Sequence, residues 1–526
     1  MATALPSKGP RTVATHKLRG FIPTFSDQAH HQPLFNTLTA TASDLQAELS
    51  NGTIKSTQVV EEYHRSIIAH NSVLNAVWEL APGAMQRAEE LDLLREKGQF
   101  LGPLHGIPIL VKKDNINLDP SFGLGTSGGA VALVDSVPAS SAIIIEKLLE
   151  AGVIILGKTT MSEMAYFKGS NIRCGWSAAA GHAQSAYSPD GSSSGSAVAV
   201  SAGFAPIALG TETSGSLVCP ATRAALFTIK STVGIVPGKG IMPLSANFDI
   251  AGPLTKSPGD AADLLTVLID PTKTHVPDGG YASALTGDWK DIKVGTLDPE
   301  FWAMPHSAIK YVEDATSQMN SEVRAVYSKI KELAKSYHGN ISKLPSEEPF
   351  ELPDGSDALS EAFTSDLEQD LDCFLQEELT TSRVRSLKEL VQWNFDHADV
   401  ALTAEYPNQD ALVAATKVDH TGTNREEIAA YTKAAGAKFL DLFTEHDVDV
   451  IIAPTDSPLF LFSSAGAFPT ATLPISTLGF NGRPFGLTIA APPHNEAVLV
   501  TVMSAWESAF PARKTPEAYL TLEPID

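Results

Sequence analysis

The chain has 526 residues, and its 61 acidic side chains outnumber its 38 basic ones, which gives a formal net charge of −23. Binding to nucleic acid or to anionic membranes depends on lysine and arginine, so this balance argues against both kinds of partner. Hydrophobic residues make up 43% and charged residues 19%, proportions typical of a folded globular protein with a large core.

The few cysteines and the N-terminus bear on the compartment. Cys174, Cys219 and Cys373 form no CxxC pair, so neither a zinc ribbon nor a disulfide framework is expected. The N-terminus lacks the apolar segment of a secretory signal, and no uninterrupted apolar run reaches the roughly 18 residues of a membrane span. These features predict a cytoplasmic protein with free thiols.

In chain order, residues 1–40 have little periodicity and are predicted to form a loosely packed arm. From residue 41 onward, amphipathic helical patterns such as 139–151 alternate with short apolar runs that are typical of buried strands. Four such runs stand out, at residues 106–111, 153–156, 448–454 and 484–489. Strands alternating with helices predict an α/β protein with a three-layer α/β/α core.

Residues 41–526 are predicted to form one domain, in which residues 270–435 differ from the rest. Their two long helical patterns, 305–340 and 360–395, are charged and amphipathic, and an acidic, proline-containing loop separates them. We expect this region to be a cap or insertion over the core that shapes the substrate pocket.

Three short motifs match known patterns without the structural context that those patterns need. Residues 152–159 fit the phosphate-loop pattern, but their central Val-Ile-Ile-Leu indicates a strand rather than a loop. Residues 123–128 fit GxGxxG but follow no strand. Residues 191–195 fit GxSxG, which would make Ser193 a nucleophile beside a histidine, but no hydrophobic strand precedes them. Nucleotide binding and a histidine-based triad are therefore disfavoured.

Three other segments carry residues suited to acyl chemistry. Residues 106–115 place two lysines at the end of a buried strand, where desolvation disfavours an ammonium ion and favours a neutral base. Residues 190–199 pack serines between glycines before an Ala/Val run, as in a tight loop that enters a helix. Residues 210–220 hold Gly215, whose turn can direct successive N–H groups at one anion. Each segment alone is more often structural than catalytic.

Taken together and in this order, the segments resemble the amidase signature family. GWSAAAG at 175–181, GSSSGSAVAV and GTETSGSLVCPA look most like its peptide amidase branch. The resemblance covers most of the chain, namely Ser43–Asn75, Gly102–Asn115, Ala151–Glu163, Asp190–Pro220 and Pro484–Ile489. It implies a mixed, mostly parallel central sheet and a carbon–nitrogen hydrolase that needs no metal and no cofactor.

The resemblance also implies a role for each site residue. Ser216 would be the nucleophile, and Ser192, preceded by a cis peptide bond, would bridge it to a lysine. The backbone N–H groups of Thr213, Ser214, Gly215 and Ser216 would form the oxyanion hole. Ser214 departs from the Gly or Asp of many members, and its hydroxyl is expected to tune specificity.

Two lysines compete for the third place in the triad. The family pattern that the chain resembles has one lysine, four residues after a proline and directly before Asp or Glu. Here the distance from Pro108 selects Lys112, whereas adjacency to Asp114 selects Lys113. Neighbouring strand residues face opposite ways, so both cannot point inward without a bulge. We prefer Lys113 as the triad lysine, because the segment after the strand should determine which residue at the end of the strand faces inward.

The predicted activity is hydrolysis of a small amide, a peptide amide or a carbamate through a Ser-Ser-Lys triad and an acyl-enzyme. Acyl transfer to an amine on the same triad is the first alternative. An inactive scaffold with a broken relay and an amidotransferase subunit are the remaining alternatives. The expected partner is a small-molecule amide substrate; a homodimer is also compatible with the sequence, and no pattern identifies the residues that bind substrate.

Overall fold

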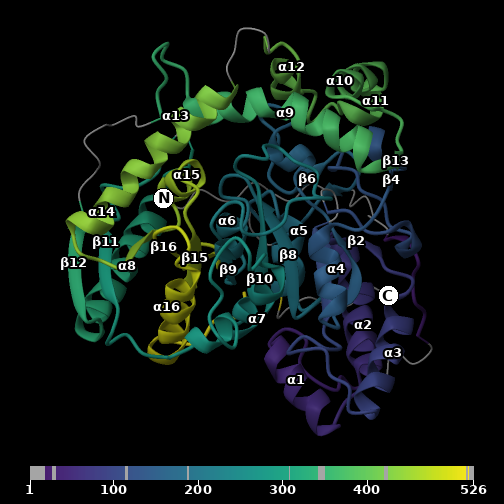
Figure 1. The fold of residues 1–526 in the computed structure, drawn as a ribbon, viewed down its shortest axis with the longest axis horizontal. Coiled ribbons are helices and arrows are strands. Elements are labelled where there is room, and N and C mark those ends of the chain that lie inside the picture. The colour runs from purple at the N-terminus through teal and green to yellow at the C-terminus, as the bar shows by residue number, and fades with distance from the viewer. Residues whose placement is uncertain are drawn as a thin grey trace, which may run out of the picture.

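A computed structural model describes residues 18–25, 31–112, 116–185, 189–306, 308–341, 350–419, 425–516 and 519. At its centre is a 12-stranded sheet that runs through the whole molecule (Figure 1). In spatial order its strands are β1 (Arg19–Gly20), β2 (Val77–Leu80), β5 (Ile154–Thr159), β3 (Pro108–Lys112), β8 (Ile207–Glu212), β10 (Ile250–Thr255), β9 (Phe227–Lys230), β15 (Thr470–Thr477), β16 (Pro484–Ala490), β14 (Val450–Pro454), β11 (Lys293–Leu297) and β12 (Ser336–Ile341).

The predicted α/β class and mixed sheet are confirmed, but the expectation that most strand pairs are parallel is wrong. Among the described strands of this sheet, six neighbouring pairs are antiparallel and five are parallel. The parallel pairs include β5-β3-β8 and β14-β11-β12, whereas the strands from β8 to β14 pair antiparallel. Continuous apolar runs are usual in parallel strands, but an antiparallel strand buried on both faces has the same pattern.

Helices of the N-terminal and C-terminal parts of the chain pack against this sheet or against the helices that cover it. Helices α5 (Ser194–Ser201) and α6 (Val218–Arg223) follow the two serine-rich segments and contact the central strands. The other helices of this group are α1 (Ala42–Asn51), α2 (Ser56–Leu74), α3 (Ala84–Glu96), α4 (Ile143–Glu150), α7 (Pro258–Leu268), α15 (Leu459–Ala465) and α16 (Glu496–Ala509). Helix α5 is buried on all sides, because its residues are small enough for the strands to approach it closely.

The residues expected to form a cap, 270–435, divide between the sheet and a helical layer. Strands β11 and β12, with α8 (Glu313–Leu333) between them in the chain, extend one edge of the sheet. The helices that follow lie along another side of the molecule, where α9 spans from α13 toward β13 (Figure 1). They are α9 (Ala358–Glu377), α10 (Leu387–Asp396), α11 (Ala398–Ala401), α12 (Asp410–Ala415) and α13 (Arg425–Ala437), and the short strand β13 (Leu379–Thr381) pairs with β4 (Val137–Pro138). Helix α14 (Asp441–Glu445) follows beyond residue 435.

The disfavoured phosphate-loop match is part of a strand. Residues 154–159 form β5, and the fully buried Lys158 donates from Nζ to the carbonyl oxygens of Ile116, at 3.0 Å, and Gly125, at 2.7 Å. Lys158 therefore holds loop backbone rather than a phosphate. Within the described ranges, none of the helices combines the length and the apolar character that crossing a bilayer requires.

Candidate active site

Strand β3 ends in a buried lysine near the middle of the sheet. Lys112 is its last residue and is fully buried, and its Nζ donates to Ser192 Oγ at 2.8 Å and to Thr211 Oγ1 at 2.8 Å. Thr211 belongs to β8, the parallel neighbour of β3. The structure therefore brings Lys112 to Ser192. Lys113, which the sequence favoured, lies outside the described residues.

The serine-rich loop before α5 brings Ser192 and Ser193 to the end of β8. The peptide bond between Gly191 and Ser192 is cis, as the family resemblance implied. Ser193 Oγ donates to Thr211 O at 3.1 Å and accepts from Thr211 N at 3.2 Å. Both hydrogen bonds go to strand backbone, so Ser193, the nucleophile of the alternative GxSxG interpretation, is held as a structural residue.

The turn between β8 and α6 carries Ser216. Gly215 adopts φ +80°, and a Cβ there would meet Cys219 Sγ and Phe460 Cδ2, each at 3.1 Å. Burial raises the pKa of Cys219 well above its ordinary value, so its thiol stays protonated. Ser216 is 7% exposed, and its carbonyl oxygen accepts from Ser193 N at 3.4 Å. This contact joins the two serine-rich turns.

Four successive N–H groups of this turn are free to bind an anion. In the part of the chain that the structure describes, the backbone N–H groups of Thr213, Ser214, Gly215 and Ser216 donate to no protein acceptor. The next two N–H groups, by contrast, are bound to a carboxylate: Glu212 Oε2 accepts from Leu217 N at 2.6 Å and from Val218 N at 3.1 Å. A run of unused donors beside a serine is the arrangement an oxyanion hole needs.

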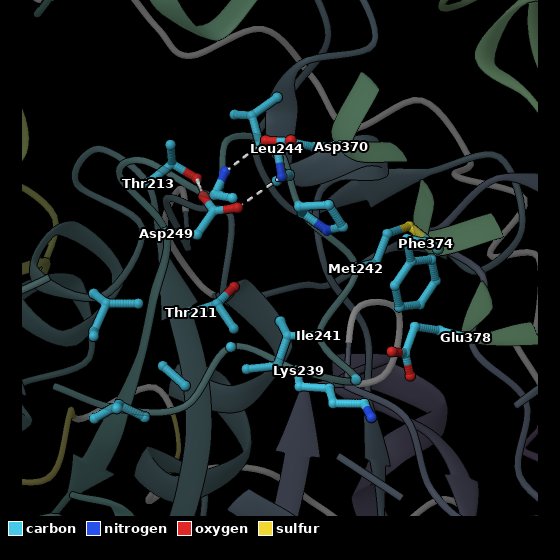
Figure 2. Close-up of a pocket in the computed structure, with 18 of the residues that line it drawn as sticks. Thr211, Thr213, Lys239, Ile241, Met242, Leu244, Asp249, Asp370, Phe374 and Glu378 are labelled. Carbon is cyan, nitrogen blue, oxygen red and sulfur yellow. Dashed lines mark hydrogen bonds between the residues drawn. The ribbon is translucent and has the colours of Figure 1, made fainter. Parts of the chain in front are cut away.

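A second carboxyl group, that of Asp249, binds the first residue of the same turn, Thr213. Thr213 Oγ1 donates to Asp249 Oδ1, and Asp249 Oδ2 accepts from Leu244 N at 2.8 Å and Ser245 N at 3.0 Å. Figure 2 shows the Thr213 and Asp249 side chains pointing toward each other. Although Asp249 is partly open to a cavity, burial raises the pKa of its carboxyl group to about 7.

That cavity has a volume of about 270 Å³ and includes Thr211 and Thr213 in its wall. Apolar side chains such as Met242 and Phe374 line one side of it (Figure 2). Phe374 comes from α9, so the helical layer contributes directly to the wall. A mostly apolar cavity with a few polar groups suits a small organic ligand.

Sequence reasoning missed three residues of this site. Thr211 and Glu212 stand directly before the turn that carries Ser216, and their position in GTETSGS was the available signal. Asp249 had no local signal, because it reaches Thr213 from 36 residues further along the chain.

The sequence matches the amidase family over residues 58–500. A probable amidase of Arabidopsis thaliana is 30% identical over 501 residues, which cover 92% of each chain. The solved peptide amidase of Stenotrophomonas maltophilia superposes with a TM-score of 0.80 at 29% identity, over 91% of this chain and 98% of that chain. A glutamyl-tRNA(Gln) amidotransferase chain of Chloroflexus aurantiacus is 32% identical, over 53% of this chain and 58% of its own length.

Proposed function

The chain belongs to the amidase family, and we propose that it hydrolyses carbon–nitrogen amide bonds through Ser216, Ser192 and Lys112. The observation that carries the triad is the 2.8 Å hydrogen bond from the fully buried Lys112 Nζ to Ser192 Oγ. Burial disfavours the ammonium form of a lysine; in the neutral form Nζ accepts from the Ser192 hydroxyl across the same contact and can take its proton.

In the proposed first half-reaction, Lys112 takes the proton of Ser192, and Ser192 takes the proton of Ser216. Ser216 Oγ then attacks the amide carbonyl carbon, and the free N–H groups of residues 213–216 stabilise the negative charge on the carbonyl oxygen. As the carbon–nitrogen bond breaks, the relay returns a proton to the departing amine. In the second half-reaction, the relay takes a proton from water as the water oxygen attacks the acyl-enzyme carbonyl. The proton returns to Ser216 Oγ as the carboxylic acid leaves.

We further propose that the substrates include peptide amides. The likeness to the Stenotrophomonas peptide amidase extends over 91% of this chain and supports this class more directly than the half-length matches to amidotransferase chains. The acyl-transfer alternative uses the same acyl-enzyme and differs only in the attacking group. Adding a free amine to the assay and quantifying acid against new amide separates the two reactions.

The test is amide hydrolysis by the wild type and by Ser216→Ala, Ser192→Ala and Lys112→Ala, on a panel of peptide amides and aryl amides. Each of the three variants is expected to lose activity by about three orders of magnitude or more, since triad members act as a unit. Lys113→Ala and Ser194→Ala are the matched controls and should retain most activity. An active Ser216→Ala variant contradicts the nucleophile, and an inactive Lys113→Ala beside an active Lys112→Ala contradicts the register.

Labelling by a fluorophosphonate checks the nucleophile without a substrate. The wild type should be labelled on Ser216, and Lys112→Ala should be labelled much more slowly because its relay has no base. Absence of labelling, with the protein folded, would favour the inactive scaffold.

A further inference from the structure

The cavity of about 270 Å³ lies next to two threonines that belong to the candidate active site. Thr211 Oγ1 accepts from Lys112 Nζ at 2.8 Å, and Thr213 carries the first of the four N–H groups that donate to no acceptor among the described residues. Figure 2 shows both threonines on one side of the cavity and Met242 and Phe374 on the other. The cavity is therefore the space beside a carbonyl group that binds to the turn 213–216.

Two carboxyl groups in the wall of this cavity already bind donors of the protein. Asp370 Oδ1 accepts from Arg425 Nη2 at 2.6 Å, and its Oδ2 accepts from Ala246 N at 2.8 Å. Asp249 accepts from the Thr213 hydroxyl group and from two backbone N–H groups. Because protein donors satisfy both carboxyl groups, a ligand gains little by offering them a donor of its own.

The rest of the wall is largely apolar. It includes the side chains of Ile241, Met242, Leu244 and Phe374. Lys239 and Glu378 also belong to the lining, and Figure 2 shows them at the end of the view away from Thr213. A cavity of about 150 Å³ with apolar walls is large enough to bind benzene, so the volume here is sufficient for the side chain of leucine or phenylalanine.

In a peptide amide, two groups branch from the carbon beside the scissile carbonyl: the side chain of the last residue and the rest of the peptide. Peptide backbone carries N–H and C=O groups that would lose their water in an apolar cavity, at a cost in free energy. An apolar side chain has no such cost and gains from burial. A side-chain carboxylate would be desolvated beside the carboxyl groups of Asp249 and Asp370, which disfavours it.

We propose that this cavity binds the side chain of the residue that carries the scissile amide, and that it selects an apolar side chain over a carboxylate. The inference rests on the proposed amidase function and adds its substrate preference. Phe374 is then a specificity-determining residue, because it contacts the bound side chain from the wall opposite Thr211 and Thr213.

The experiment compares kcat/KM for acetylated dipeptide amides whose last residue is glycine, leucine, asparagine or aspartate. It is run at about pH 8, above the pKa of about 7 to which burial raises the carboxyl group of Asp249. The leucine amide is expected to exceed the glycine amide by about tenfold or more, because it buries an apolar side chain. The asparagine amide should exceed the aspartate amide by about tenfold or more, because the two side chains have the same shape and differ in charge.

Phe374→Ala tests the apolar wall. The ratio of kcat/KM for the leucine amide to that for the glycine amide should fall by about fivefold or more, since the bound side chain loses its contact with the ring. Phe395→Ala is the matched control and should leave the ratio unchanged, because Phe395 is 53% exposed on α10 and is not part of the lining. The ratio compares two substrates on one protein sample, so a smaller folded fraction does not alter it. Equal kcat/KM for the two amides in the wild type, or an unchanged ratio in Phe374→Ala, would overturn the proposal.

Binding to Ser216→Ala separates this inference from the proposed reaction. If the wild type hydrolyses none of the amides, the proposed function fails, and the cavity is tested by calorimetric titration of this variant with the glycine and leucine amides. The leucine amide should then bind about tenfold more tightly than the glycine amide. Equal affinities would show that the cavity does not bind the side chain.

Discussion

Glu212 Oε2 accepts the backbone N–H of Leu217 at 2.6 Å, so the last residue of β8 fixes the start of α6. The turn 213–216 is thus held at both ends by Glu212, through its backbone in the strand and its side chain at the start of the helix. The N–H groups of Leu217, the N-cap of α6, and of Val218, its first residue, are used in this contact, whereas those of residues 213–216 have no acceptor among the described residues.

Glu212→Ala tests this anchor. Two buried N–H groups lose their acceptor, so the free energy of unfolding should fall by about 2–4 kcal/mol, and activity should fall with it. Urea unfolding and amide hydrolysis measure the two effects. Glu212→Gln keeps one acceptor oxygen and should lose less on both scales; equal losses in the two variants would mean that the hydrogen bonds are not the cause.

Thr211→Val removes one hydrogen bond to Lys112 and keeps the shape of the side chain. Because Thr211 Oγ1 accepts from Lys112 Nζ at 2.8 Å, we expect the variant to lower kcat by about tenfold, equivalent to about 1.4 kcal/mol, with little change in KM. Thr211→Ser keeps the hydroxyl group and should stay near wild type. Steady-state kinetics on one amide substrate measures these effects. A loss in Thr211→Val alone indicates that the hydroxyl group positions Lys112, whereas equal losses in both variants indicate a packing role.

Gly215→Ala should disturb the turn for two reasons. The backbone is in the left-handed region, which costs an alanine about 1–2 kcal/mol, and the new methyl group would press on Cys219 and Phe460. We expect a large loss of kcat with a modest loss of thermal stability. Gly83→Ala is the control, because no described atom lies within 4 Å of its added Cβ. Unchanged kinetics in Gly215→Ala would contradict the role of this turn.

Asp249 should make stability depend on pH. Burial raises its pKa from 3.8 to about 7, so between these values the folded protein binds a proton that the unfolded chain has released. Its contribution to the free energy of unfolding is therefore complete at low pH and is lost as pH rises toward 7.

Asp249→Asn keeps the neutral shape at every pH and removes this dependence. Relative to the variant, the wild type should lose about 1 kcal/mol or more of its unfolding free energy between about pH 5 and pH 8. Chemical denaturation at several pH values measures this difference. Parallel curves for the two proteins would show that Asp249 does not titrate in this range.

Local chemistry in the sequence is enough to identify the strand that carries the lysine and the two turns that carry the serines. Three adjacent apolar residues, Ile109–Val111, are typical of a strand that is covered on both faces, and the glycine at 215 permits a backbone conformation that other residues avoid. These are consequences of side-chain and backbone chemistry, and they appear in the sequence wherever the chain finally lies.

Which side chains meet depends instead on how whole elements pack. The sequence pattern of a strand does not identify the strand that pairs with it. The pairing of β3 with β8, and with it the contact of Lys112 with Thr211, is therefore seen only in the folded sheet. The sequence likewise did not predict whether the central strands run parallel or antiparallel. Antiparallel strands are usually identified by alternating apolar and polar residues, and a strand buried on both faces lacks that alternation. Arg223 and Asp456 are 233 residues apart, and their ion pair forms because α6 packs against β16, the neighbour of β14 in the sheet. Long-range contacts of this kind arise from the packing of helices on strands, which no local pattern encodes.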